Sequence, residues 1–264
     1  LKDDPDVAHW AQVFSLSPDQ GSLRQWCIQR GLLDPHQPRA LHGSVWSGTF
    51  AKELEHEAQR LISSAAQPHP GDDDRLDLCH LATYTLDDAG TREIDDGVSL
   101  EVQNGEVWIW VHIADPARLI SSGSPLDQEA RRRATSLYLA DGVLPMLPLS
   151  LAAGPLSLRA GQHTAAVSVA VRLDSAGAIA DRRIARSWVQ PRYGLTYADG
   201  DELIELAPPG DETLADLSQL MQLRSRWRRQ QGALMFDRME GRFRRHEGEL
   251  SLQLVEPSPA RLMV

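Results

Sequence analysis

The spacing of apolar residues divides the chain into a helical first part and a strand-rich second part. Residues 5–14 and 17–31 have the apolar spacing of helices, and the second stretch runs from a Ser-Pro-Asp start to Gly31. A third helix is predicted over 47–65, with four apolar residues on one face: Phe50, Leu54, Ala58 and Leu61. We expect these helices to form a small N-terminal domain over 1–66.

The second part begins after a boundary segment and alternates between apolar and polar positions. Residues 67–80 open with a stretch rich in Pro, Gly and Asp and are predicted to be a linker that leads into a second domain over 81–264. One hairpin is predicted over 98–114, where an Asn-Gly pair is typical of a type I′ turn, and another over 165–189.

Helices and one irregular stretch complete the second domain. Ser124 opens a Ser-x-x-Asp sequence and is predicted to cap a short helix, while the proline-rich residues 139–155 are expected to be irregular. Residues 211–231 predict a long helix. The predicted fold class is therefore α+β, with a small helical domain, which could be helix-turn-helix-like, followed by an antiparallel sheet plus helices.

Composition places the chain among globular proteins. Of its 264 residues, 42% are hydrophobic and 24% are charged, a balance that allows a substantial core. No apolar run approaches the roughly 18–20 residues of a membrane span, and the first residues lack a signal-like pattern. Cys27 and Cys79 are far apart and have no metal-ligand spacing. We expect a cytoplasmic, monomeric protein without a membrane partner.

The net charge of −10 argues against a nucleic-acid partner until its distribution is considered. Residues 1–96 carry 17 acidic and 8 basic side chains, whereas residues 97–264 carry 20 and 19. The acidic first part favours a packing role for the helical domain. Eight arginines lie within 224–245, where Trp227 and Phe243 could stack on bases. The alternative for these arginines is a solvated helix face with the tryptophan in the core.

Both ends of the chain indicate a piece of a longer protein. The chain begins with Leu1 rather than Met, and Ser258-Pro259 has the composition of a helix start close to the last residue. We therefore expect the second domain to be incomplete at its C-terminal end.

The densest group of chemically active residues lies over 85–97. Five acidic residues occur there just before a predicted strand, and Mg²⁺ is the counter-ion best suited to offset their repulsion. Asp95 and Asp96 would point to opposite faces of a regular strand, so a shared site requires irregular backbone, which Gly97 permits. The alternative is an exposed acidic loop that binds nothing.

Several short segments around this loop occur in a recognisable order. The acidic positions are Asp87, Glu93 and the pair Asp95-Asp96. The neighbouring segments, in chain order, are Arg75-Leu-Asp-Leu, Thr83-Tyr-Thr-Leu-Asp, Val111-His-Ile-Ala-Asp, Gly123-Ser-Pro-Leu-Asp, Thr135-Ser-Leu-Tyr-Leu, Leu144-Pro-Met-Leu-Pro and Leu156-Ser-Leu. Over about residues 73–264, this series resembles the RNB catalytic domain of RNase II and RNase R-type exoribonucleases.

The resemblance implies hydrolytic 3′→5′ degradation of single-stranded RNA to 5′-mononucleotides by a two-metal type mechanism with Mg²⁺, or alternatively Mn²⁺. It implies a catalytic set of four residues, of which all but Glu93 would hold metal: Asp87, Glu93, Asp95 and Asp96. Tyr138 matches the aromatic residue that stacks on the 3′-terminal base. The nearby Arg131, Arg132 and Arg133 are candidates for phosphate contacts.

The chain also departs from the family pattern. Glu93 stands where the family has Asp, and Ala140 stands where it has Pro. A later arginine that grips the scissile phosphate, a late glutamate, an S1 domain and cold-shock domains have no counterpart in the 264 residues. These departures leave two alternatives, which are a catalytically impaired RNB-like RNA-binding or regulatory protein and another Mg²⁺-dependent phosphoesterase.

Four residues near the acidic loop have structural interpretations. His112 alternates with apolar neighbours and is expected to be a buried or half-buried, hydrogen-bonded histidine. Trp108 and Trp110 share a strand face and are expected to be core or packing residues. Asp115, at a strand end, is expected to orient loops through hydrogen bonds, with support of the metal site as a further role.

Overall fold

The structure is a computed structural model that describes residues 5–17, 19–33, 41, 44, 46, 49–139, 142–234, 239–246 and 249–263. The chain divides into two compact units, Leu1–Thr49 and Phe50–Val264. This division falls earlier than the predicted boundary after residue 66. The reason is that Ala58, on the third helix, packs into an apolar cluster of the second unit that includes Leu126.

The first unit contains the helices α1 (Pro5–Val13) and α2 (Gln20–Gln29) within its described residues. The second helix begins later than predicted, at Gln20 rather than Ser17, because Asp19 is its N-cap and the Asp19 carboxylate accepts the N–H of Ser22 at 3.0 Å. The third predicted helix is shorter than expected and belongs to the second unit.

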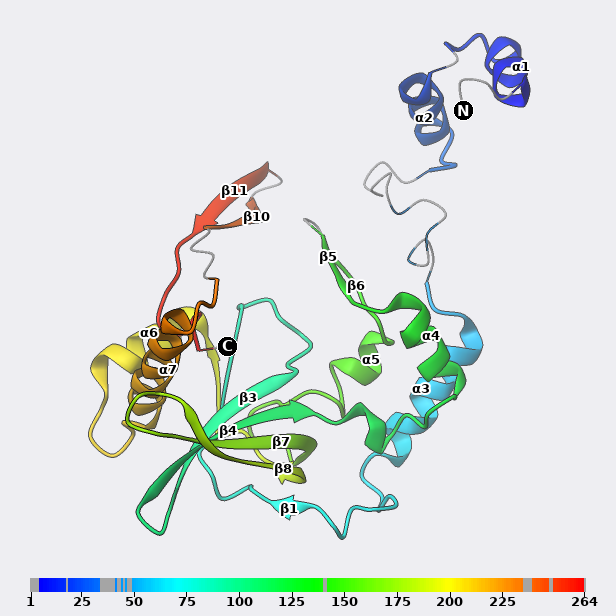
Figure 1. Ribbon diagram of the computed structural model, residues 1–264. Coiled ribbons are helices and arrows are strands. Elements are labelled where there is room, and N and C mark those ends of the chain that lie inside the picture. The colour runs from blue at the N-terminus through cyan, green and yellow to red at the C-terminus, as the bar shows by residue number, and fades with distance from the viewer. Residues whose placement is uncertain are drawn as a thin grey trace. The chain divides into compact units, whose positions relative to one another are not determined.

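A seven-stranded sheet forms the centre of the second unit, in the order β1-β8-β7-β4-β3-β2-β9 (Figure 1). Its strands are β1 (Leu76–Asp77), β2 (Tyr84–Asp87), β3 (Asp96–Gln103), β4 (Glu106–Ala114), β7 (Thr164–Leu173), β8 (Ile179–Val189) and β9 (Tyr193–Thr196). Both predicted hairpins are confirmed, as β3–β4 and β7–β8. Asn104 and Gly105 have φ of 55° and 79°, as a type I′ turn requires.

Two pairings in this sheet are parallel, although an antiparallel sheet was predicted. β1 pairs with β8, and β2 pairs with β9 from Tyr84↔Tyr193 to Asp87↔Thr196. These pairings join segments that are distant in sequence, and β1, β2 and β9 are two to four residues long, too short for a clear alternation. β2 meets β3 at one residue pair, Tyr84↔Val98, so β9 provides most of its main-chain support.

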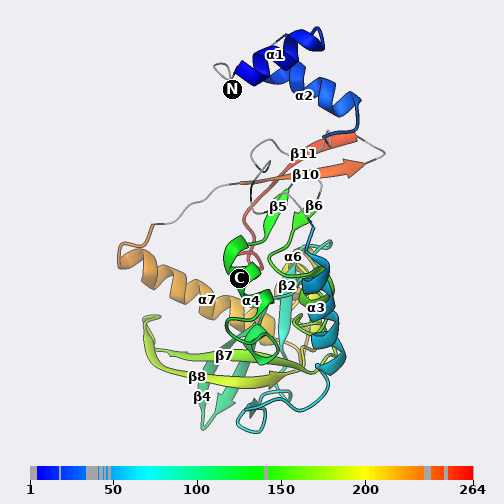
Figure 2. The ribbon, with the colours of Figure 1, turned by 90° about the vertical axis from the view of Figure 1, so that its right-hand side faces the viewer.

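Helices pack on one face of the sheet and beside it. The helices of the second unit, within its described residues, are α3 (Lys52–Ser64), α4 (Pro125–Arg133), α5 (Leu149–Ala152), α6 (Tyr197–Leu206) and α7 (Thr213–Gln230), with a 3₁₀ turn at Pro116–Arg118. α6 and α7 cover the face that carries Ile109, whereas α3 lies beside α4 and α5 (Figure 2). α7 confirms the predicted long helix. None of the described helices is long and apolar enough to cross a bilayer.

Two small hairpins lie outside the main sheet. β5 (Leu137–Leu139) pairs with β6 (Gly142–Leu144), and β10 (Glu240–His246) pairs with β11 (Glu249–Val255). The predicted irregular stretch therefore contains β6 and α5. Its prolines mark element ends rather than interrupt elements, since Pro148 stands at the N-cap of α5.

Alternation along β4 separates two apolar clusters. Trp108 and Trp110 are 1% and 2% exposed and face away from α7, which confirms their predicted place in the core. His112 follows them on the same face and is fully buried, as predicted. Its Nε2 lies 2.8 Å from Ser99 Oγ and its Nδ1 lies 2.7 Å from Ser168 Oγ. Burial lowers the pKa of His112 to about 4, so this histidine is a neutral core residue.

Candidate active site

The four predicted carboxylates lie where two neighbouring strands meet the loop that joins them. Asp87 is the last residue of β2 and Asp96 is the first residue of β3. Asp95 lies just before the strand in irregular backbone, which is the arrangement that a shared site requires. Gly97 allows β2 to approach, because a Cβ at this position would stand 3.1 Å from the carbonyl oxygen of Tyr84.

These carboxylates share one electrostatic environment. Burial, followed by repulsion from Asp96 and Asp95, raises the pKa of Asp87 to about 6. Burial raises the pKa of Asp95 above its usual range, and burial together with the charge of Asp95 does the same for Asp96 and Glu93. These groups thus lose water, and three of them also face a negative neighbour, which is a cost unless a cation or donor offsets it.

The residues present suit a divalent cation. Glu93 Oε1 is a buried oxygen for which the described residues supply no hydrogen-bond donor. A hard cation would offset both the lost hydration and the repulsion, and carboxylate oxygens are its preferred ligands. Within the described part of the chain, no three such side chains are already gathered as a metal site.

The loop that carries these carboxylates is held from two sides by hydrogen bonds to its main chain. On one side, the N–H of Leu158 donates to the carbonyl oxygen of Ile94 at 2.8 Å, and Ser157 Oγ accepts the N–H of Ile94 at 3.1 Å. On the other side, the N–H of Ala114 donates to the carbonyl oxygen of Asp95 at 2.8 Å. The loop is thus fixed by the Leu156-Ser-Leu segment and by the end of β4.

Tyr138 lies in the β5–β6 hairpin with 69% of its surface exposed. Its pKa is raised by desolvation and then by the charges of Glu93, Asp95 and Asp87. The structure therefore brings this ring within electrostatic reach of the carboxylates, although the tyrosine is far from them in sequence. An exposed ring beside the carboxylates is available for stacking on a base.

The three arginines predicted to contact phosphate have different surroundings on α4. Arg131 pairs with Asp127 and Arg132 with Glu129, and their side chains are 71% and 49% exposed. Arg133 is buried, with its side chain 3% exposed. The buried guanidinium donates to Glu129 and to the carbonyl oxygen of Pro145 and lies 3.8 Å from the ring centre of Phe50. Its role is to support the base of the β5–β6 hairpin, so the structure does not place it for phosphate contact.

The other arginine candidates are less well placed. Arg224 lies over the ring of the half-buried Trp227 at 4.5 Å and donates to the carbonyl oxygen of Gly177 at 3.1 Å, so it packs α7 against the β7–β8 turn. The side chains of residues 242–245, and also Ala140, lie outside the described residues. An arginine that was not singled out from the sequence, Arg261, lies 3.4 Å from Asp88 beside the carboxylate loop.

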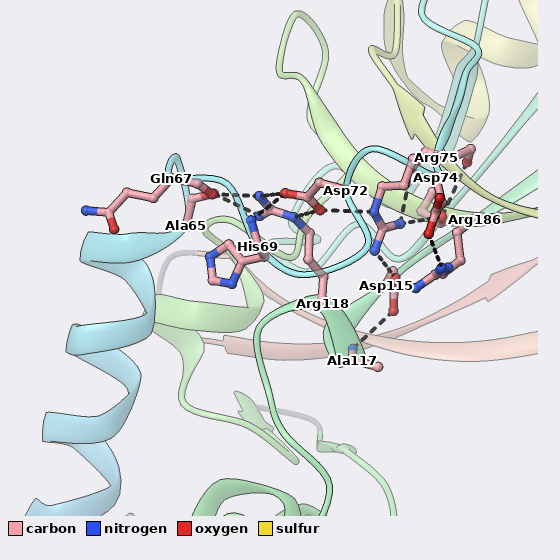
Figure 3. Close-up of polar contacts among 12 residues, drawn as sticks. Ala65, Gln67, His69, Asp72, Asp74, Arg75, Asp115, Ala117, Arg118 and Arg186 are labelled. Carbon is pink, nitrogen blue, oxygen red and sulfur yellow. Dashed lines mark hydrogen bonds and ion pairs between the residues drawn. The ribbon is translucent and has the colours of Figure 1, made fainter.

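Sequence reasoning missed the partners of Asp115. Its Oδ2 accepts a hydrogen bond of 2.6 Å from Arg75 (Figure 3). The Nε of Arg75 lies 3.3 Å from Asp72 Oδ1. Arg118 donates to both oxygens of Asp72, at 2.9 and 2.8 Å. These four side chains, which we call the buried charge cluster, are 3–13% exposed. Arg75 belongs to the Arg-Leu-Asp-Leu segment, one of the segments that surround the acidic loop in the sequence. Its membership of that series was the sign in the sequence that Arg75 could support the site.

Comparison with known protein families and sequences gives consistent matches. Residues 75–264 match the model of the family described as the RNB domain. An uncharacterized ribonuclease of Synechocystis is 40% identical over 239 residues, which cover 90% of this chain and 36% of that protein. The chloroplastic/mitochondrial ribonuclease II of Arabidopsis thaliana is 42% identical over 171 residues, 64% of this chain and 21% of that protein. The chain thus spans about a third or less of the length of these relatives.

Solved structures share the fold at low sequence identity. RNase R of Mycoplasma genitalium, in complex with ribose-methylated single-stranded RNA, has a TM-score of 0.72 and 20% identity over 81% of this chain and 34% of that chain. Yeast Ssd1, described as a pseudonuclease, has a TM-score of 0.50 and 20% identity over 67% of this chain and 20% of that chain. These likenesses show the fold alone.

Proposed function

The chain belongs to the RNB domain family, and on that basis we propose that the protein is a hydrolytic exoribonuclease that degrades single-stranded RNA from its 3′ end to 5′-mononucleotides. The observation that carries this proposal is the group of four carboxylates with raised pKa values within electrostatic reach of the exposed ring of Tyr138. The names of the relatives, ribonuclease II and RNase R, support the same class of enzyme.

Asp87, Asp95 and Asp96 would hold Mg²⁺, with Mn²⁺ as the alternative ion. When bound, the ion would supply the positive charge that the scissile phosphate and the leaving 3′-oxygen need during hydrolysis. The carboxylates of Asp95 and Asp96 belong to adjacent residues at the start of β3, and the carboxylate of Asp87 belongs to the last residue of the neighbouring strand β2. Glu93 adds a fourth carboxylate, whose buried Oε1 remains available as an acceptor.

The α4 and β5–β6 region would hold the RNA beside these carboxylates. Tyr138 would stack on the 3′-terminal base, which is tolerant of sequence because every base has a flat π-face. Arg131 is exposed and its ion pair with Asp127 is a weak surface pair, so it can exchange that partner for an RNA phosphate. Arg132 is half exposed but donates to both oxygens of Glu129, which is 12% exposed, so it would contact a phosphate while it keeps this partner. Arg133 would keep the hairpin in place without touching RNA.

We also propose that the protein acts as a monomer in the cytoplasm, with single-stranded RNA as its partner. The Arabidopsis relative is named for chloroplasts and mitochondria. Fractionation of the cells that make this protein, together with size determination in solution, would check these two points.

An RNA-shortening assay tests the proposed activity directly. The full-length protein is incubated with 5′-labelled single-stranded RNA in Mg²⁺ or in EDTA. We expect a ladder that descends from the 3′ end in Mg²⁺ and no shortening in EDTA, while RNA labelled at its 3′ end should release labelled mononucleotide from the start. Internal fragments as first products would contradict exonuclease action, and absence of RNA binding would contradict any RNA-directed function.

Replacing Tyr138 with Ala should change the length of the final RNA product and leave the first cleavages intact. The reason is that a stacked base contributes about 1–3 kcal/mol, which matters most when few nucleotides remain bound. The end product is measured on a sequencing gel, with Val143→Ala as the control, because Val143 is the exposed cross-strand partner of Tyr138 on β6. An end product identical to that of the parent would argue against stacking at this position.

A second candidate function is an RNA-binding protein of the same family without catalysis. The observation that favours it is Glu93 at the position where the family has Asp, together with the shared fold of the pseudonuclease Ssd1. A Glu93→Asp variant separates the two candidates. If the parent binds RNA without shortening it and the variant gains shortening, Glu93 is the cause of the lost activity. An active parent rules the second candidate out.

A further inference from the structure

Arg75 is anchored to the backbone of two strands as well as to the other members of the buried charge cluster. Its Nη1 donates to the carbonyl oxygen of Ala166 on β7 at 3.2 Å and to that of Ser187 on β8 at 3.4 Å. The guanidinium also lies over the ring of Trp188, 5.3 Å from its centre. Five donors in a fixed planar fork allow one arginine to join two strands and two carboxylates at once. Arg75 therefore has little freedom to move.

Asp115 connects the fixed guanidinium of Arg75 to the end of β4. One carboxylate oxygen of Asp115 accepts from Arg75 and the other accepts the N–H of Ala117 at 3.1 Å (Figure 3). The N–H of Asp115 donates to the carbonyl oxygen of Ala165 at 3.0 Å. Both side-chain oxygens and the main-chain donor are thus used. The residue before it, Ala114, is the last residue of β4.

Ala114 is also the residue that holds Asp95. Its N–H donates to the carbonyl oxygen of Asp95 at 2.8 Å. Asp96 is different, because it lies in β3 and pairs with Ile113 in the regular ladder of the sheet. Asp95 lies outside the strand and depends on this contact and on the anchoring of its neighbour Ile94.

We propose that Arg75 and Asp115 are positioning residues for Asp95. Their ion pair fixes the end of β4, and the end of β4 fixes the backbone from which the Asp95 carboxylate projects. The proposal rests on the proposed function in one respect, which is that Asp95 is taken as a metal ligand. Metal sites demand ligand distances within about 0.2 Å, so a small shift of this backbone would weaken metal binding. Neither residue touches the reacting atoms.

The variant Asp115→Asn tests this inference. The amide has the size of the carboxylate and can still accept the N–H of Ala117, but it removes the charge that faces Arg75. We expect the Mn²⁺ dissociation constant to rise about 10–100-fold, as when a residue that orients a metal ligand is changed. RNA affinity in EDTA should equal that of the parent. Mn²⁺ binding is measured by electron paramagnetic resonance without RNA, and folding by thermal unfolding.

A matched control and a second variant make the result decisive. Asp74→Asn is the same chemical change in the same segment, at a residue whose side chain is 77% exposed and 3.6 Å from Arg186, and it should bind Mn²⁺ as the parent does. Arg75→Lys keeps the charge but loses the planar fork, so it replaces Asp115→Asn if that variant does not fold. Raising the Mn²⁺ concentration should restore the turnover of a folded variant toward the parent value.

The outcomes separate this inference from the proposed function. If Asp115→Asn binds Mn²⁺ as tightly as Asp74→Asn does, and only its melting temperature falls, the pair is purely structural and the inference is overturned. A parent protein that binds no Mn²⁺ also overturns it. A parent that binds Mn²⁺ more tightly than Asp115→Asn, yet shortens no RNA, overturns the proposed function and supports the inference.

Discussion

Replacing Asp96 with Asn is expected to slow RNA shortening by about 10³-fold or more while RNA still binds, because several kcal/mol of charge stabilisation would be lost. The amide keeps the shape of the side chain and removes one negative charge that would hold the ion. The backbone should stay in place, because Asp96 pairs with Ile113 in the β3–β4 ladder. Single-turnover shortening of 5′-labelled RNA measures the rate, and titration in EDTA measures RNA affinity.

Two comparisons make the Asp96→Asn result specific. Asp181→Asn makes the same change at an exposed position of β8 and should keep the parent rate. In EDTA, the Asp96→Asn protein should bind RNA at least as tightly as the parent, since a charge that repels phosphate is gone. Turnover equal to that of the parent would remove Asp96 from the metal site.

Replacing Asp72 with Ala is expected to lower the free energy of unfolding by about 3–5 kcal/mol, the usual cost of leaving a buried charge without its partner. Asp72 is the carboxylate that faces Arg118, whose guanidinium also donates to the carbonyl oxygens of Ala65 and Gln67 after α3. Without Asp72, Arg118 keeps two carbonyl oxygens but loses the carboxylate it pairs with, and of its two carboxylates Arg75 keeps only that of Asp115. Denaturant unfolding measures the loss.

The residue next to Asp72 provides the control for this stability prediction. Asp73→Ala removes the same charge from an exposed position and should change the free energy of unfolding by no more than about 0.5 kcal/mol. Equal effects of the two variants would mean that the buried charge cluster does not stabilise the fold.

The same ion pair predicts a pH dependence. Hydrogen bonding from Arg118 holds the pKa of Asp72 well below its usual range. A lowered pKa in the folded state means that the unfolded chain takes up the proton first, so this stabilisation is present above about pH 4 and is lost as the pH falls further. The difference in unfolding free energy between the parent and Asp72→Ala should therefore be constant from neutral pH to about pH 4 and shrink below it. A difference that does not shrink would assign the stabilisation to something other than charge.

Local features of the sequence were sufficient to predict several parts of the fold and of the candidate site. An Asn-Gly pair between alternating segments predicts its own hairpin, because the turn requires two positive φ values that few other residues adopt. The acidic loop could be placed just before a strand, and a site shared by Asp95 and Asp96 required irregular backbone there. The structure has Asp95 outside the strand and Asp96 as the first residue of the strand. Burial of His112 followed from its place between apolar neighbours.

The remaining features depend on contacts between distant residues, which local patterns do not encode. Arg75 and Asp115 are 40 positions apart, and the residues next to each of them do not indicate that the two side chains form an ion pair. The arginines of α4 look alike in sequence, yet Arg133 alone of the three turns toward Phe50 and Pro145, because position on the helix decides which side chain faces the core. The pairing of β2 with β9 could not be predicted from local patterns either, because the two strands are far apart in the sequence.

That last pairing has a consequence for the order in which the candidate site is completed while the chain is being synthesised. A ribosome makes the four carboxylates early, but the strand that holds Asp87 gains its parallel neighbour only after Thr196 has been added. Pairing between segments so distant in the chain is a late event in folding, because the intervening residues must first be ordered. A nascent chain, which is surrounded by ribosomal and messenger RNA, therefore carries the four carboxylates before it can hold them in their final arrangement.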